Sequence, residues 1–192
     1  MHGAMTTLQT FFRVFFAILT ACGAAVAMAQ QADNVDAQVE QSTHVRRGDA
    51  APEFACQATD GRQFDLSSSK GKVTVLYFFS TSVGASLTEM RHLENEVVRK
   101  VGSRDDFQII GIGRGHTREE LVKVGGENRL TFPLAADPQA EIYGRYFLKF
   151  VPRTVVVGRD GSIIHMASGY DEALGLERLK HVLNGELKRG KS

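Results

Sequence analysis

The stretch that most constrains the fold of this chain is residues 73–93, VTVLYFFSTSVGASLTEMRHL. Its first part, Val73–Phe79, is a nearly continuous apolar run rich in β-branched and aromatic residues, which is typical of a strand buried on both faces. A short polar turn follows, and from Leu87 to Lys100 apolar residues recur at helical spacing. A strand of this kind needs cover on both sides, so the stretch predicts an α/β domain.

The rest of the chain continues the alternation of strands and helices. Further strands are predicted at Phe54–Ala58, Gln63–Asp65, Phe107–Gly113, Thr154–Gly158 and Ser162–Met166, the last two as an antiparallel hairpin. Helical segments are predicted within Leu66–Lys72, from the capping box at Thr117 to about Gly125, over Ala140–Phe147 and over Glu172–Leu187. This order predicts a central mixed sheet flanked by helices, with an N-terminal β-hairpin extension.

The charge of the chain argues against two classes of partner. Its 192 residues carry 23 Lys and Arg against 22 Asp and Glu, a formal net charge of +1. Proteins that bind nucleic acid or an acidic membrane surface concentrate positive charge. We therefore expect a protein or peptide partner, and no nucleic acid.

Residues 1–29 have the features of a secretory signal peptide. Arg13 is their only charged residue, an apolar stretch follows it, and Ala27-Met28-Ala29 is a small-x-small cleavage site. Leu19-Thr20-Ala21-Cys22 also matches a lipobox, so a lipid anchor at Cys22 is the alternative, and the mass of the mature N-terminus distinguishes the two. The apolar stretch is shorter than the roughly 20 residues that cross a bilayer. We expect an exported, periplasmic protein with no membrane span in its mature chain.

Four segments follow from these patterns. They are a signal peptide at 1–29, a flexible polar lead-in at 30–46, one domain at 47–188 and a tail at 189–192. The lead-in has little apolar periodicity, which is typical of a mobile segment.

A series of short motifs occurs within the domain in a specific order. They are Gly48-Asp49-Ala50-Ala51-Pro52-Glu53-Phe54, Gly71-Lys72-Val73, Phe132-Pro133-Leu134 with Asp137-Pro138, and Phe150-Val151-Pro152-Arg153-Thr154. Their order and spacing over residues 47–188 resemble the thioredoxin-like superfamily, of the TlpA/ResA type or with the AhpC/TSA redoxin domain. The resemblance implies a thioredoxin-like fold and a context of envelope thiol redox chemistry or cytochrome maturation.

In that family the turn after the central strand usually carries a Cys-x-x-Cys pair. Laid on this pattern, Val83 and Ser86 occupy the two cysteine positions, with Gly84 and Ala85 between them. Valine has no ionisable group, and a serine hydroxyl needs a general base to become a nucleophile. His92 follows on the same predicted helix but off the face of Ser86. We therefore assign no catalytic residue in this turn.

Other positions in the same region depart from the family pattern. Tyr77 stands where the family has a buried acid or an asparagine, and Phe79 and Ser82 replace two tryptophans. These joint changes predict a degenerate active site that binds a partner without turnover. The predicted binding groove consists of Ser82, Val83, Gly84, Ala85, Ser86, Val151 and Pro152.

The resemblance also implies that Pro152 follows a cis peptide bond and lies against the turn. A proline there lacks an N–H donor and redirects the chain, so the backbone groups before it can pair with an extended peptide. The alternative is that Val151-Pro152 only shapes a tight turn between a helix and a strand.

Cys56 is the only cysteine that remains if the signal peptide is removed after Ala29. An intrachain disulfide is then impossible. We interpret Cys56 as a small buried side chain of the N-terminal hairpin. The alternative function is a thiol-disulfide oxidoreductase or a one-cysteine peroxidase that acts through the Cys56 thiol.

The remaining motifs predict no cofactor and no metal site. The six histidines are not paired at metal-ligand spacing, and no cysteine joins them. Gly111-Ile112-Gly113-Arg114-Gly115 lacks the spacing of a dinucleotide-binding turn and is interpreted as a turn off the sheet. Arg114, His116 and Arg153 can come close to the Val83–Ser86 turn, although we favour the interpretation that they are unrelated solvated charges.

Overall fold

The structure is a computed structural model that describes residues 37–189. The predicted signal peptide at 1–29, the alternative lipid anchor at Cys22 and residues 30–36 of the predicted lead-in lie outside the described residues. The chain divides into two units, Met1–Gln41 and Ser42–Ser192. Of the first unit only 37–41 are described, and they are helical. Between residues 37 and 189, no helix is long and apolar enough to cross a membrane.

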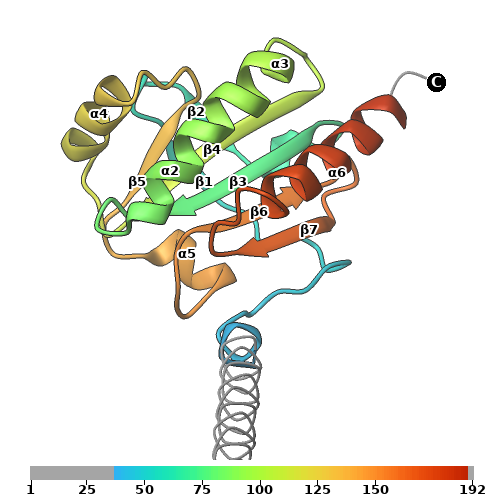
Figure 1. The fold of residues 1–192 in the computed structure, drawn as a ribbon, viewed down its shortest axis with the longest axis horizontal. Helices are drawn as coiled ribbons and strands as arrows, with labels where there is room; N and C mark the ends of the chain where they lie inside the picture. Colours follow the sequence, from blue (N-terminus) through green and yellow to red (C-terminus); the bar gives the residue numbers. More distant parts are fainter. Residues whose placement is uncertain (1–36, 190–192) are drawn as a thin grey trace, which may run out of the picture. The chain divides into compact units, whose positions relative to one another are not determined.

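The second unit is built on a five-stranded mixed sheet with the strand order β5-β4-β3-β6-β7 (Figure 1). Strands β3, β4 and β5 are parallel, whereas β6 is antiparallel to β3 and β7 is antiparallel to β6. The bounds of these strands are Val73–Phe79 for β3, Phe107–Arg114 for β4, Leu134–Asp137 for β5, Arg153–Val157 for β6 and Ile163–Ser168 for β7. A separate two-stranded sheet pairs β1 (Ala55–Gln57) with β2 (Gln63–Asp65).

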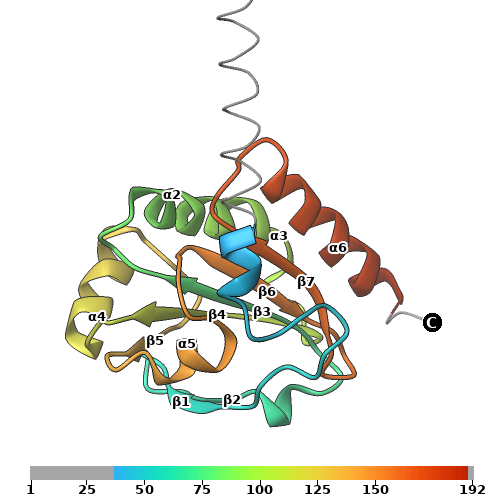
Figure 2. The same ribbon diagram turned by 90° about the horizontal axis from the view of Figure 1, so that it is seen from below.

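Helices cover both faces of the large sheet, as Figure 2 shows in a view along its edge. Helix α2 (Gly84–His92) continues through a π-helical segment (Leu93–Val98) into α3 (Arg99–Val101), and this long helix lies beside α6 (Gly175–Arg189) on one face. The other face carries α5 (Glu141–Tyr146) and the β1–β2 hairpin. Helix α4 (Arg118–Glu127) packs near the β5 edge, and Ser67–Ser69 form a short 3-10 helix.

The two faces form two separate hydrophobic cores. One core packs the β3 side chains Tyr77 and Phe79 under α2 and α6. The other packs Leu76 and Phe78 against α5 and the β1–β2 hairpin. Because successive side chains of a strand point to opposite faces, β3 contributes to both cores, and all seven of its residues are buried.

The predicted fold class is confirmed, and so are the bounds of the central strand. The capping box of α4 is also confirmed, because Thr117 Oγ1 accepts a hydrogen bond from Glu120 N at 3.3 Å while Thr117 N donates to the Glu120 carboxylate at 2.8 Å. For the helix after the central strand, the predicted start at Leu87 is wrong, since α2 begins at Gly84. Strand β5 was not predicted, because it has only four residues and forms through pairing with distant segments, mainly the end of β4.

Residues Ser42–Val45 lie against α5. Thr43 bridges to Phe147, and His44 N donates to Tyr146 O at 2.8 Å. Val45 is buried with the α5 aromatic rings in the second core. The N-terminal residues of this unit therefore add cover to the α5 face of the sheet.

The glycines of β4 have a packing role that differs from the predicted turn. Gly111 and Gly113 lie within the strand, and a Cβ atom at Gly113 would stand 2.8 Å from Leu121 Cδ2 of α4. Of the three glycines in this motif, only Gly115, with φ of +74°, has a backbone conformation that favours glycine. The close approach of α4 to β4 thus explains why the motif is glycine-rich without any dinucleotide.

We predict that Gly113→Ala lowers the free energy of unfolding by about 1–3 kcal/mol, because the added methyl overlaps the fully buried Leu121 side chain. Urea unfolding measures the effect. Gly126→Ala in α4 is the matched control, because nothing lies within 4 Å of its Cβ position. A Gly113→Ala protein as stable as the control variant would contradict this account of the packing.

Candidate functional site

The candidate site is the turn between β3 and α2, at the end of the central strand. Phe78 in β3 pairs with Arg153 in β6, so this turn and Val151-Pro152 flank the same end of the sheet. The Val151-Pro152 peptide bond is cis. The strand register therefore brings the two parts of the predicted groove together.

The residues of the turn differ in their exposure to solvent. Ser82, Gly84 and Ala85 are exposed, Val83 is half-buried and Ser86 is fully buried. Val83 is the N-cap of α2 and supplies no side-chain hydrogen bond to the helix. The first amide N–H groups of α2 are therefore uncapped at an exposed position, where a helix dipole favours negative charge.

Ser86 is held inside the domain by Tyr77. The Tyr77 hydroxyl donates to the Ser86 carbonyl oxygen at 2.5 Å, and Ser80 N donates to Ser86 Oγ at 3.5 Å. Burial raises the pKa of Tyr77 far above its ordinary value, and the nearby Glu89 adds to the shift. Tyr77 therefore stays protonated and acts as a hydrogen-bond donor to the start of α2.

His116 contacts the turn from the loop between β4 and α4. Thr81 N donates to His116 Nε2 at 3.1 Å, so this nitrogen is an acceptor and the ring proton lies on Nδ1. Nδ1 donates to the Glu120 carboxylate at 3.3 Å. The imidazole also stacks on Phe79 with 6.1 Å between ring centroids. The sequence placed His116 near this turn only as the less favoured interpretation.

The two arginines of the same suggested cluster lie elsewhere, on the aromatic side chains of the α5 face. The guanidinium carbon of Arg114 is 4.5 Å from the centroid of the Tyr143 ring, and that of Arg153 is 4.6 Å from the centroid of Phe147. Arg153 is 2% exposed and donates to Ser42 Oγ. The interpretation of Arg153 as a solvated charge is therefore wrong, because the sheet register turns its side chain toward the second core.

Glu89 is a buried acid that the sequence analysis missed. It lies one helical turn after Ser86 and is 5% exposed, and its Oε1 accepts from Thr154 Oγ1 at 2.7 Å. Its Oε2 is buried and has no hydrogen-bond partner among residues 37–189. Burial raises the pKa of Glu89 to about 7. The three-residue spacing from Ser86 was the sequence signal that could have found it.

A cavity of about 20 Å³ adjoins Glu89 between α2, α6 and β7, which is room for about one water molecule. Its other polar lining residues include Thr154, His165 and Tyr170. The Tyr170 hydroxyl hydrogen-bonds to His92 Nδ1, and the other ring nitrogen of His92 lies 3.9 Å from Glu172. His92 therefore contacts the cavity lining through Tyr170 and does not reach the turn.

Cys56 lies away from the turn. It is in β1, in the hairpin that packs on the opposite sheet face from α2. Burial raises the pKa of the Cys56 thiol to about 11, and the charge of Asp137 contributes to the shift. A thiol with this pKa is almost wholly protonated at neutral pH, and the protonated form is a poor nucleophile.

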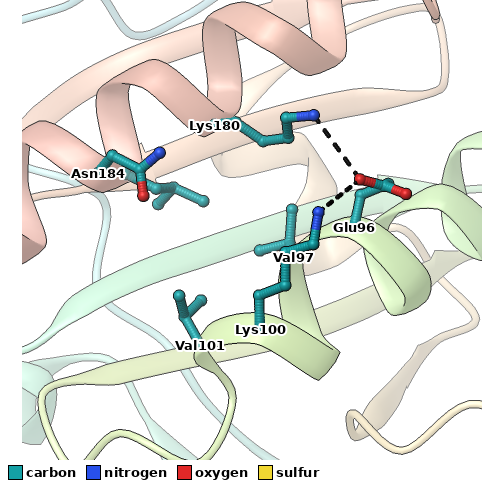
Figure 3. Close-up of a pocket in the computed structure, with 7 residues that line it drawn as sticks. Glu96, Val97, Lys100, Val101, Lys180 and Asn184 are labelled. Atoms are coloured by element: carbon teal, nitrogen blue, oxygen red, sulfur yellow. Dashed lines mark hydrogen bonds and ion pairs between the residues drawn. The ribbon is translucent and has the colours of Figure 1, made fainter.

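Within the described part of the chain, no three His, Cys, Asp or Glu side chains gather where they could hold a metal ion. A hollow of about 110 Å³ lies between α3 and α6 and away from the turn (Figure 3). Lys100 and Lys180 both pair with Glu96 there, at 2.8 and 3.7 Å. Because this carboxylate already pairs with both ammonium groups, the hollow offers little charge to a ligand.

Comparisons with known proteins agree with this geometry. The model of the AhpC/TSA family matches residues 47–166, and the chain belongs to that family. Thiol-disulfide oxidoreductase ResA from Bacillus cereus is 26% identical over 181 residues, which cover 94% of this chain and 96% of ResA. ResA from Geobacillus thermodenitrificans is 25% identical over 129 residues, covering 67% and 73% of the two chains.

A solved structure extends the comparison to three dimensions. The solution structure of a candidate protein disulfide isomerase from Bacteroides thetaiotaomicron is 34% identical, with a TM-score of 0.74. The match covers 78% of this chain and 95% of that chain. The thioredoxin-like fold and the redoxin family that the sequence motifs implied are thus confirmed.

We predict that Glu89 makes the domain less stable as the pH rises. The folded-state pKa of about 7 lies above the ordinary value of 4.5, so the native state binds the extra proton. The resulting stabilisation is complete below about pH 4.5 and is lost as the pH rises through about 7. Relative to Glu89→Gln, the wild-type free energy of unfolding should fall by roughly 2–3 kcal/mol between pH 5 and pH 8. Parallel pH profiles for the two proteins would contradict this assignment.

Proposed function

We propose that this protein is an exported redoxin with a degenerate active site, which binds a partner protein or peptide without thiol turnover. The single observation that carries the proposal is the composition of the turn. Val83 and Ser86 stand at the family's cysteine positions, and neither side chain can supply a thiolate.

The surroundings of the turn support binding over catalysis. The Ser86 side chain is fully buried, so it is not presented to a substrate. Tyr77 uses its hydroxyl to hold the start of α2, which is a structural use of the position where the family has an acid or asparagine. Ser82, Gly84 and Ala85 remain exposed on the adjacent surface. A partner that contacts this surface meets backbone N–H groups and small side chains.

The proposed groove consists of the residues that the sequence analysis named, Ser82–Ser86 with Val151 and Pro152. Val151 is half-buried and Pro152 is buried, so the second segment forms a wall beside the turn. Two relatives are named thiol-disulfide oxidoreductase, and the family resemblance suggests a setting of envelope thiol redox chemistry or cytochrome maturation. Export rests on the signal-like residues 1–29, and the proposed domain spans 47–188 between the lead-in at 30–46 and the tail at 189–192.

The alternative enzyme, acting through the Cys56 thiol, has less physical support. The thiol is partly buried in the hairpin, and its pKa of about 11 suppresses the thiolate at neutral pH. A peroxidase or thiol transferase needs the opposite shift, which cationic neighbours or a helix N-terminus produce. The charged residue that affects the Cys56 thiol is instead Asp137, which is acidic and raises the thiol pKa further.

We predict that the wild-type chain does not accelerate the reduction of insulin by dithiothreitol. The double variant Val83→Cys/Ser86→Cys should acquire this activity, because the first cysteine would stand at the uncapped N-terminus of α2, where a thiolate is stabilised. Val83→Cys alone is the control, since it lacks the resolving thiol. Insulin reduction by the wild-type protein at the rate of the double variant would sink the proposal.

We also predict that Ser82→Arg reduces capture of partners from envelope extracts by chemical crosslinking. The long charged side chain would project from the exposed turn and obstruct the groove. Ser103→Arg is the matched control, because Ser103 is exposed in the turn after α3. Equal capture by the two variants would show that the turn is not the contact surface.

A further inference from the structure

The loop between α5 and β6 contains an aromatic residue in an unfavourable backbone conformation. Phe150 has φ of +70°, in the left-handed region that L-residues with large side chains rarely adopt. Its side chain has no polar atom that could offset the cost by a local hydrogen bond. Backbone strain of this kind persists only where the surroundings impose it, and it is concentrated at functional sites.

Hydrogen bonds at both ends of this loop impose its conformation, and Arg153 also donates to Lys149 O at 3.4 Å. The Tyr143 hydroxyl donates to Phe150 O at 2.6 Å, and Leu148 N donates to Ser42 O at 2.8 Å. With its backbone fixed at both points, the loop presents apolar side chains to solvent. Leu148 is 55% exposed and Phe150 is 39% exposed. We call Leu148, Lys149, Phe150 and Val151 the apolar loop.

This exposure is concentrated in one place. Of the four large hydrophobic residues that are exposed between residues 37 and 189, two lie in the apolar loop, and the others, Val122 and Leu174, are isolated on α4 and before α6. Single exposed apolar residues are ordinary, whereas two in one short loop favour an interaction surface. The apolar loop also runs directly into Val151-Pro152, so it continues the proposed groove.

Two cations border the apolar loop without carboxylate partners. Arg114 stacks on the Tyr143 ring, the same residue that holds Phe150 O, and forms no ion pair with the described residues. The Lys149 ammonium group likewise has no carboxylate partner among residues 37–189. An exposed aromatic anchor with unpaired positive charge beside it is complementary to an acidic, apolar ligand.

We propose that the apolar loop, with Arg114 and Lys149, docks an extended acidic segment of a partner protein that carries large apolar side chains. This inference rests on the proposed function, because it names the chemistry of the partner at the same groove. The Phe150 ring is the anchor, and the two cations select for flanking carboxylates.

A fluorescein-labelled peptide of alternating Glu and Leu or Phe residues tests the proposal by fluorescence anisotropy with the full chain. The peptide should bind, and binding should weaken at high salt because Lys149 is exposed and Arg114 is only half-buried. A peptide with Ser in place of the apolar residues and one with Lys in place of Glu should not bind. Equal binding of all three peptides, or of none, would overturn the proposal.

Variants of the chain locate the contact. Phe150→Ala should weaken peptide binding at least about tenfold, as expected for loss of an aromatic anchor. Lys149→Glu should weaken it and remove much of the salt dependence. Val122→Ala is the matched control, because Val122 is 52% exposed and lies on α4, outside the apolar loop. Unchanged binding by Phe150→Ala would overturn the proposal.

Phe150→Gly separates the loss of the ring from a loss of folding. Both Phe150→Gly and Phe150→Ala remove the ring, but glycine accepts a φ of +70° without strain. The glycine variant should therefore melt roughly 2–4 °C above the alanine variant while both bind equally weakly. A glycine variant that regains binding would show that the loop's fold, and not the ring, was responsible.

The remaining outcomes distinguish this inference from the proposed function. If Ser82→Arg abolishes partner capture while Phe150→Ala does not, the apolar loop is not the docking surface and the proposed function survives. If neither variant changes capture, both fail. Concentration-dependent dimerisation lost in Phe150→Ala would assign the surface to a second copy, and binding to phosphatidylglycerol vesicles in place of the peptide would assign it to a membrane. Either result overturns the proposal.

Discussion

The complete burial of β3 is the constraint on which the rest of the structure depends. A strand at the centre of a sheet with every side chain buried needs one core above it and another below it. The long α2–α3 helix and α6 supply the first core, and α5 with the β1–β2 hairpin supplies the second (Figure 2). The chain can reach solvent only at the ends of the strand, and the candidate site lies at one of them.

At that end, the interactions that hold the turn differ from those of a thiol site. Tyr77 ties its hydroxyl to the Ser86 carbonyl, and His116 accepts from the backbone of Thr81. The buried acid on α2 is Glu89, which contacts Thr154 and keeps one carboxylate oxygen without a partner among the described residues. Buried polar contacts thus hold the turn and the first residues of α2 in place.

Most of the fold could be predicted because it depends on local signals. The apolar run at Val73–Phe79 and the capping box at Thr117 each specify an element through neighbouring residues. The start of α2 and the existence of β5 could not be predicted in this way. Strand β5 is short and exists through its pairing with β4, and the turn before α2 has no capping side chain to mark it.

The sequence by itself determined the family, the thioredoxin-like order of elements and the absence of cysteine from the turn, because these follow from residue types and their spacing. Only the tertiary structure decided which polar residues matter beside that turn. Burial of Glu89, the contact of His116 and the strained exposure of Phe150 each arise from elements distant in the chain. Desolvation and backbone strain depend on what packs around a residue, and that information is not local to its sequence.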